Sequence, residues 1–180
     1  GMTPVREALR RLAAEGALVA RGNRRIMVPE IEAEQLDHLA FARLSLEPEL
    51  AVRACKRLET SEIDVIESID AELDAAVARG DVQGYLQQNY RFHMAIYDGA
   101  DAPLLAGIVA GLWLRFGPSL RVICGQLGTL NLPDRHGDAV AALRARQADA
   151  VDRAIRSDIE QGIEHMRTAL GAGTNLIKSG

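Results

Sequence analysis

The stretch TPVREALRRLAAEGALVARGNRRIMVP, residues 3–29, contains three elements in a definite order. Thr3 and Pro4 have the residue types of a helix start, and Gly16 has that of a helix end. Apolar residues between them recur on one helical face. Two short apolar runs follow, and they flank a turn that is rich in arginine and glycine. The stretch therefore predicts a helix and then a β-hairpin with a basic tip.

That order is the second half of a winged helix-turn-helix, in which a recognition helix enters the major groove and a basic wing contacts the DNA. The stretch closely resembles the DNA-binding domain of GntR-family bacterial transcription regulators. The resemblance implies DNA contacts from the helix and the wing tip, by Thr3, Arg6, Arg10, Arg21 and Gly22. It also implies further helices ahead of the recognition helix, for which the chain has no room. We therefore expect residues 2–29 to be a truncated domain that binds palindromic operator DNA poorly.

Charge and composition support two different surfaces. Residues 1–30 carry six arginines against three glutamates, although the chain of 180 residues has a net charge of −4. A basic end on an acidic body suggests nucleic acid at the basic end.

Apolar runs fall short of the roughly 18 residues of a membrane span, and no signal segment opens the chain. The two cysteines lack metal-binding spacing and indicate free thiols. We expect a cytoplasmic protein without membrane contact.

Residues 30–170 show helical periodicity throughout, interrupted by glycine, proline and capping residues. The pattern predicts an all-α, antiparallel bundle of six to seven helices, followed by a flexible tail over residues 171–180. The expected helices cover residues 30–57, 61–79, 82–97, 103–116 with a turn or two more to 124, 134–156 and 159–170. The first is expected to kink or restart at Pro48. Thr60 or Ser61 is the expected cap of the second and Asp81 that of the third, and a tight turn at Ser157 and Asp158 is expected before the last.

Asn89 and His93 form the first candidate site in this bundle. They are four residues apart in a run without glycine or proline, so a helix places both on one face, one turn apart. An amide oxygen and an imidazole nitrogen in this arrangement can bind one divalent metal or one polar ligand. The alternative is a buried histidine that a neighbouring amide satisfies.

Residues 31–170 resemble the FCD-type effector-binding domain of FadR-like GntR regulators. In its metal-binding versions, an Asp-x-x-x-His pair joins one histidine from each of the last two helices, and 21 residues separate those two histidines. The resemblance matches His93 to the first histidine and Asn89 to the aspartate. Aligning residues 154–158 with the family pattern places Gln147 and Ala169 at the other two histidines. His165, one turn before Ala169, is a partial replacement.

His136 is excluded from this set by the same alignment. It precedes Gln147 by eleven residues, which is about 16 Å along a continuous helix. His38 is expected on the surface and Trp113 in the core.

Arg43 begins an Arg-x-x-x-Glu pattern with Glu47, with which the family domain often starts. The resemblance implies that Arg43 binds a carboxylate of the effector, to which its planar guanidinium is suited. The alternative is an ion pair with Glu47 on the helix surface.

These residues predict a ligand-responsive transcription regulator, a homodimer and not an enzyme. Its pocket is expected to bind a small organic acid through Arg43, Asn89, His93 and Gln147, without a tightly held metal. The first alternative is Zn²⁺, Ni²⁺ or Mn²⁺ held weakly by Asn89, His93 and His165. A metal-dependent helical-bundle enzyme and a dimerisation module with a vestigial pocket are further alternatives. Sugar acids, dicarboxylates, amino acids and aromatic acids all fit as effectors.

Overall fold

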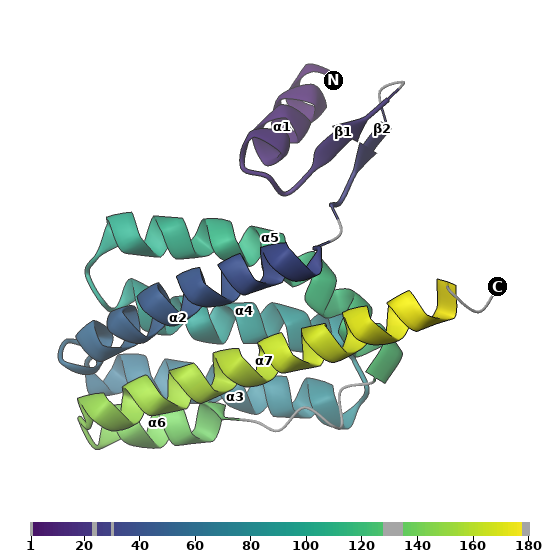
Figure 1. Ribbon diagram of the computed structural model, residues 1–180. Coiled ribbons are helices and arrows are strands. Elements are labelled where there is room, and N and C mark those ends of the chain that lie inside the picture. The colour runs from purple at the N-terminus through teal and green to yellow at the C-terminus, as the bar shows by residue number, and fades with distance from the viewer. Residues whose placement is uncertain (1, 23–24, 30, 128–134, 178–180) are drawn as a thin grey trace.

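The computed structural model describes residues 2–22, 25–29, 31–127 and 135–177 (Figure 1). Within them lie seven helices and one two-stranded sheet, as the sequence predicts. In chain order these are α1 (Met2–Ala14), β1 (Val19–Arg21), β2 (Arg25–Met27), α2 (Ala33–Cys55), α3 (Thr60–Ala78), α4 (Val82–Asp98), α5 (Pro103–Leu127), α6 (His136–Arg144) and α7 (Ala148–Ile177). Helices α2 to α7 form the bundle. None of the described helices is both long and apolar enough to cross a membrane.

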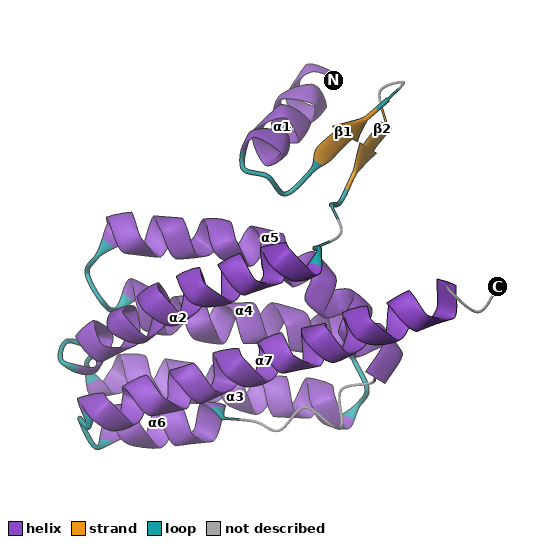
Figure 2. Cartoon of the chain, viewed as in Figure 1, coloured by secondary structure: helices purple, strands orange, loops and turns teal. Residues whose placement is uncertain are grey.

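The N-terminal head consists of α1, β1 and β2, and it lies outside the bundle (Figure 2). The strands are antiparallel, with Val19 opposite Met27 and Arg21 opposite Arg25. Gly16 lies just after the C-terminus of α1 and has a φ of +78°, a left-handed conformation that glycine adopts without strain. Arg115 of α5 lies against this position, since a Cβ on Gly16 would stand 2.9 Å from its Nε. The contact joins the turn after α1 to the bundle.

The core of the bundle is apolar, mostly aliphatic, and continuous through all six of its helices. Leu36 and Leu50 of α2, Ile66 of α3, Phe92 of α4 and Ile155 of α7 are almost completely buried. Asp81 caps α4, as the sequence predicts, by accepting a hydrogen bond from the Gly84 amide at 2.9 Å. The prediction of a Thr60 or Ser61 cap for α3 is wrong. Its cap is Glu59, which exchanges hydrogen bonds reciprocally with the turn containing Glu62.

Pro48 lies inside α2, which continues through it, so the predicted restart of the helix at Pro48 is wrong. A proline inside a helix leaves the carbonyl four residues earlier without its usual donor. That carbonyl belongs to Leu44, and Nη1 of Arg156 on α7 donates to it at 3.0 Å. A side chain from another helix therefore satisfies the group that the proline frees, and α2 continues to Cys55.

The last two helices differ most from their prediction. Helix α6 ends at Arg144 and α7 begins at Ala148, whereas the sequence predicts one helix through both and a turn at Ser157 and Asp158. Arg146 has φ +56° between the two helices, and its Nη1 donates to the carbonyl of Cys55 at 3.0 Å. Asp158 consequently lies inside α7. This helix continues to Ile177, into the segment for which the sequence predicts a flexible tail, and residues 178–180 lie outside the described part.

Candidate functional site

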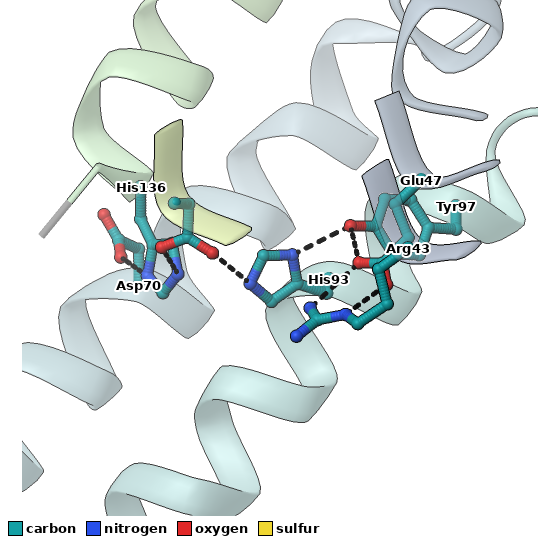
Figure 3. Close-up of polar contacts among 7 residues, drawn as sticks. Arg43, Glu47, Asp70, His93, Tyr97 and His136 are labelled. Atoms are coloured by element: carbon teal, nitrogen blue, oxygen red, sulfur yellow. Dashed lines mark hydrogen bonds and ion pairs between the residues drawn. The ribbon is translucent and has the colours of Figure 1, made fainter. Parts of the chain in front are cut away.

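A row of ionisable side chains crosses the interior of the bundle (Figure 3). It begins at Arg43 and Glu47 on α2 and continues through Tyr97 and His93 on α4 to His136 on α6. Two acidic residues complete it, Asp158 on α7 and Asp70 on α3. Five helices thus contribute to one polar centre. Apolar spacing explains this placement, because each polar residue occupies a position on the inward face of its helix.

Arg43 and Glu47 form a buried, two-point ion pair. Nε of Arg43 donates to Oε1 of Glu47 at 2.5 Å, and Nη2 donates to Oε2 at 3.1 Å. The guanidinium also lies 4.6 Å from the ring centroid of Trp113, a cation–π distance. Glu47 accepts a further hydrogen bond, at 2.7 Å, from the hydroxyl of Tyr97. Burial, together with the Glu47 carboxylate, raises the pKa of Tyr97 well above its usual value, so this hydroxyl keeps its proton.

His93 lies between Tyr97 and Asp158. Its Nδ1 makes a hydrogen bond of 3.1 Å with the Tyr97 oxygen. Its Nε2 is 3.2 Å from Oδ2 of Asp158, but without the alignment of a hydrogen bond. Burial lowers the pKa of His93, although the Asp158 carboxylate opposes the shift. The imidazole is therefore neutral near pH 7 and is available as a ligand.

His136 approaches the same carboxylate from α6. Its Nε2 is 3.6 Å from Oδ1 of Asp158, and its Nδ1 is 3.2 Å from Oδ1 of Asp70. Its ring stacks on Phe92, with 4.1 Å between the ring centroids. Burial acts to raise the pKa of Asp158, but the facing His93, His136 and Arg43 outweigh it and lower that pKa to about 2. Asp158 is therefore a carboxylate at neutral pH.

His93, His136 and Asp158 have the composition and spacing of a metal-ligand set. Each offers one ligand atom, and these atoms lie within 4.8 Å of one another. A divalent metal with ligands at about 2.1 Å separates neighbouring ligand atoms by about 3.0 Å in octahedral and about 3.4 Å in tetrahedral geometry. The histidine nitrogens lie 3.2 and 3.6 Å from different oxygens of Asp158, close to these separations, and no two ligand atoms of the set are more than 4.8 Å apart. The residues therefore fit a divalent metal held by two imidazoles and one carboxylate, with coordination positions left for a ligand.

Among the residues that the sequence singles out, the structure brings Arg43 and His93 into this centre and keeps Asn89 buried one turn before His93. Arg43 pairs with Glu47, which was the alternative to an effector contact, but the pair is buried and not on the surface. Trp113 is in the core and His38 is exposed, as predicted.

The exclusion of His136 is wrong, because its ring centroid lies 5.2 Å from that of His93. The error follows from the assumed continuous helix, which the break after Arg144 replaces by two antiparallel segments. Gln147 is exposed in that break, eleven residues before Asp158 and so about 16 Å away along α7. His165 lies seven residues after Asp158, about 10 Å along the helix, and it is outside the ligand set found among the described residues.

Sequence reasoning missed Asp158, His136, Asp70 and Tyr97. A signal for two of them was present. His136 and Asp158 are separated by 21 residues, which is the spacing that the resemblance implies for the last two family histidines. Asp158 thus stands where that pattern has a histidine. Tyr97 follows His93 by one helical turn, but without tertiary contacts its role could not be separated from ordinary core packing.

The predicted DNA contacts lie on the surface of the head. Thr3, Arg6 and Arg10 are exposed on α1, and Arg21 and Gly22 are exposed at the end of β1. Arg10 forms an ion pair with Glu7 at 2.8 Å. The other cationic groups of this set face solvent, as contact with a phosphate backbone would require.

Comparison with known proteins agrees with this architecture. The FCD domain family model matches residues 38–161. The HTH-type transcriptional regulator McbR of Escherichia coli K12 is 28% identical over 165 residues, which cover 90% of this chain and 75% of McbR. The HTH-type transcriptional repressor RspR of the same organism is 26% identical over 168 residues, covering 91% of this chain and 72% of RspR.

Solved structures give the same result. E. coli McbR/YncC superimposes with a TM-score of 0.86 at 27% identity, covering 93% of this chain and 85% of that chain. A GntR regulator from Rhodococcus sp. RHA1 superimposes with a TM-score of 0.76 at 19% identity, covering 94% of this chain and 81% of that chain. The fold is thus that of a helical regulatory bundle joined to a winged-helix segment. The chain belongs to the FCD domain family, and it is a transcription regulator of the GntR type.

Proposed function

We propose that the bundle is a sensor that binds a small organic acid at a divalent metal held by His93, His136 and Asp158. The observation that carries this proposal is the convergence of two imidazoles and one carboxylate in the bundle interior. The sequence favoured a metal-free pocket because it supplied only one good ligand, His93. The set with His136 and Asp158 favours the metal-bound alternative.

The metal is tested by elemental mass spectrometry of purified protein after incubation with Zn²⁺, Ni²⁺ or Mn²⁺ and dialysis. We expect about one equivalent of metal, and its loss in His136→Ala, because two remaining ligands hold a metal weakly. His38→Ala and His165→Ala are matched controls that should keep it, since neither residue belongs to the ligand set. Absence of metal in the unaltered protein would contradict the proposed metal centre and would support the alternative of a metal-free pocket.

The chemical class of the effector follows from the centre. A metal with three protein ligands has positions left for oxygen atoms of a carboxylate, and a second donor on the same molecule would form a chelate. The side chain of Asp158 retains 21% exposure whereas that of His93 is fully buried, so we propose that a ligand approaches the centre from the side of Asp158. Arg43 and Asn89 are the additional groups that we propose for effector recognition.

A thermal-shift series tests the effector class. Citrate, malate, lactate, glutamate and benzoate are compared at equal concentration, with and without the metal. Binding to the folded state raises the melting temperature by mass action. We expect the chelating acids to raise it only when the metal is present, and benzoate to have a smaller effect. A shift that is the same in chelator-treated protein would contradict a metal-bound effector.

We also propose that the regulator is a homodimer joined through α5. Leu104 and Ile108 are 77% and 47% exposed, and the same part of α5 contains Gly107 and Gly111, where an added Cβ would meet nothing within 4 Å. Apolar side chains beside small residues allow two helices to approach closely. Ile108→Arg should give monomers in sedimentation experiments, whereas Val65→Arg, at an exposed position on α3, should leave the dimer intact. Dimers in both variants would exclude this face of α5 as the dimer interface.

Effector binding would act on DNA through α2 and α7. Arg156 and Arg167 of α7 contact Leu44 and Asp37 of α2 at 3.0 and 2.7 Å, and α2 is the first helix after the hairpin. A shift of Asp158 on metal or effector binding would therefore change the position of the helix that leads to the head. Two heads in a dimer would read a palindromic operator. Replacing Arg6 and Arg21 by alanine should abolish what operator binding the chain has in a mobility-shift assay.

A further inference from the structure

Tyr97 makes a hydrogen bond on each side, and its hydroxyl has one proton to donate. The contact with Glu47 is 2.7 Å and the contact with His93 is 3.1 Å. A short contact to a carboxylate is typical of a charge-assisted hydrogen bond, in which the hydroxyl donates. The two oxygens of Glu47 also accept from Arg43, which holds the carboxylate in place as an acceptor.

The proton of His93 follows from this arrangement. If Tyr97 donates to Glu47, its oxygen can only accept from His93, so Nδ1 carries the ring hydrogen. The other nitrogen, Nε2, is 3.2 Å from Oδ2 of Asp158 without the alignment of a hydrogen bond. A neutral imidazole has one N–H, so with Nδ1 protonated Nε2 keeps its lone pair on the side of the ring that faces Asp158.

We propose that Tyr97 and Glu47 are positioning residues that fix the Nδ1–H tautomer of His93 and thereby present its Nε2 lone pair as a ligand. In metal sites, the histidine nitrogen remote from the metal commonly donates to an acceptor that fixes the ring. Here that acceptor is the Tyr97 oxygen, and Glu47 sets its direction. Arg43 has a defined part in this arrangement, because it is the counter-ion that holds Glu47. The inference rests on the proposed metal centre.

The test compares Tyr97→Phe with Tyr90→Phe. Phenylalanine at position 97 removes only the hydroxyl, and Tyr90 is a partly exposed tyrosine of the same helix, 43% accessible to solvent. Long-range proton–nitrogen NMR of metal-free protein reports which ring nitrogen of His93 carries the hydrogen. We expect Nδ1–H in the unaltered protein and in Tyr90→Phe. Tyr97→Phe should shift the hydrogen to Nε2, because Asp158 becomes the nearest acceptor.

The second readout is Zn²⁺ affinity by titration against a competing chelator. Loss of an outer hydrogen-bond partner typically weakens metal binding by about 10- to 100-fold, which is the decrease expected for Tyr97→Phe and not for Tyr90→Phe. An Nε2–H tautomer in the unaltered protein, or an unchanged tautomer in Tyr97→Phe, would overturn the inference. Failure of the unaltered protein to bind Zn²⁺ would refute the metal centre instead, and the tautomer measurement would still decide the role of Tyr97.

Discussion

The bundle encloses ionisable side chains, whereas the N-terminal head leaves apolar side chains open to solvent. Arg43 and Glu47 are 2% and 0% exposed, but Val5 and Val28 in the head are 58% and 49% exposed. In the bundle, each buried charge has a partner from the same chain at hydrogen-bonding distance. In the head, α1 and the hairpin cover each other only in part.

This difference indicates how each region is stabilised. Burying charge is costly unless the groups are paired, so the bundle needs all members of its polar row in place. The head has little buried surface of its own, and it therefore depends on local backbone geometry and on contacts such as Arg115 against Gly16. Substitutions should have large effects in the first region and small effects in the second.

Glu47→Gln should give the largest loss of stability. It leaves the buried guanidinium of Arg43 without its counter-ion, and breaking such a pair costs about 3–5 kcal/mol. Glu49→Gln is the matched control on the same helix, because Glu49 forms an equivalent pair with Arg53 that is half exposed. Its expected cost is below about 1 kcal/mol. Urea unfolding followed by circular dichroism measures both, and equal costs would contradict the comparison.

Arg156→Gln should have an intermediate effect. It removes the donor to the Leu44 carbonyl that Pro48 frees, and because this hydrogen bond is exposed, water can partly replace the donor, so the expected cost is about 1 kcal/mol. Arg153→Gln, an exposed position one turn earlier on α7, is the control and should be close to neutral. If Pro48→Ala restored the stability of Arg156→Gln, the assignment of the cost to this carbonyl would be supported. A neutral Arg156→Gln would exclude it.

Gly16→Ala should destabilise the head alone. A left-handed backbone costs a non-glycine residue about 1–2 kcal/mol, and the new Cβ would displace Arg115. Hydrogen exchange should show faster exchange in α1 and the hairpin, with unchanged protection in the bundle. Gly137→Ala, at a helical glycine with open space, is the control. Reduced protection throughout the bundle would show that the head and bundle unfold together.

Ile26→Ser should have the smallest effect. Ile26 is 45% exposed on β2, and substitutions at such positions usually change stability by less than about 0.5 kcal/mol. Leu36→Ser, at a completely buried position on α2, is the contrasting variant and should unfold at much lower urea concentration. A large loss from Ile26→Ser would mean that the hairpin face is covered in solution.

The sequence predicted the elements whose signals are local. Helical periodicity gave the bundle, Asp81 gave the start of α4, and the four-residue spacing placed Asn89 and His93 on one buried face. Gly16 and the arginine-rich turn gave the form of the head. In each case the determining residues lie within one or two turns of the structure that they specify.

The errors arose where a distant contact decides the local structure. No glycine or proline marks the break between α6 and α7. Arg146 adopts its left-handed conformation there while its side chain bonds to Cys55, a residue 91 positions earlier. Because the sequence prediction lacked this break, it excluded His136 from the site and placed Asp158 in a turn. Likewise, Arg156 supplies a donor to the carbonyl that Pro48 frees, and no local pattern indicates this contact.

The proline in α2 also fixes the longitudinal alignment of two helices. A carbonyl without its helical donor is an acceptor at one height along α2, and the guanidinium of Arg156 is bound at that height. Sliding α7 by a single residue, about 1.5 Å, would separate them and carry Asp158 along, since it lies two positions further on. Pro48 thereby sets the register between the helix that carries a site residue and the helix that continues from the head.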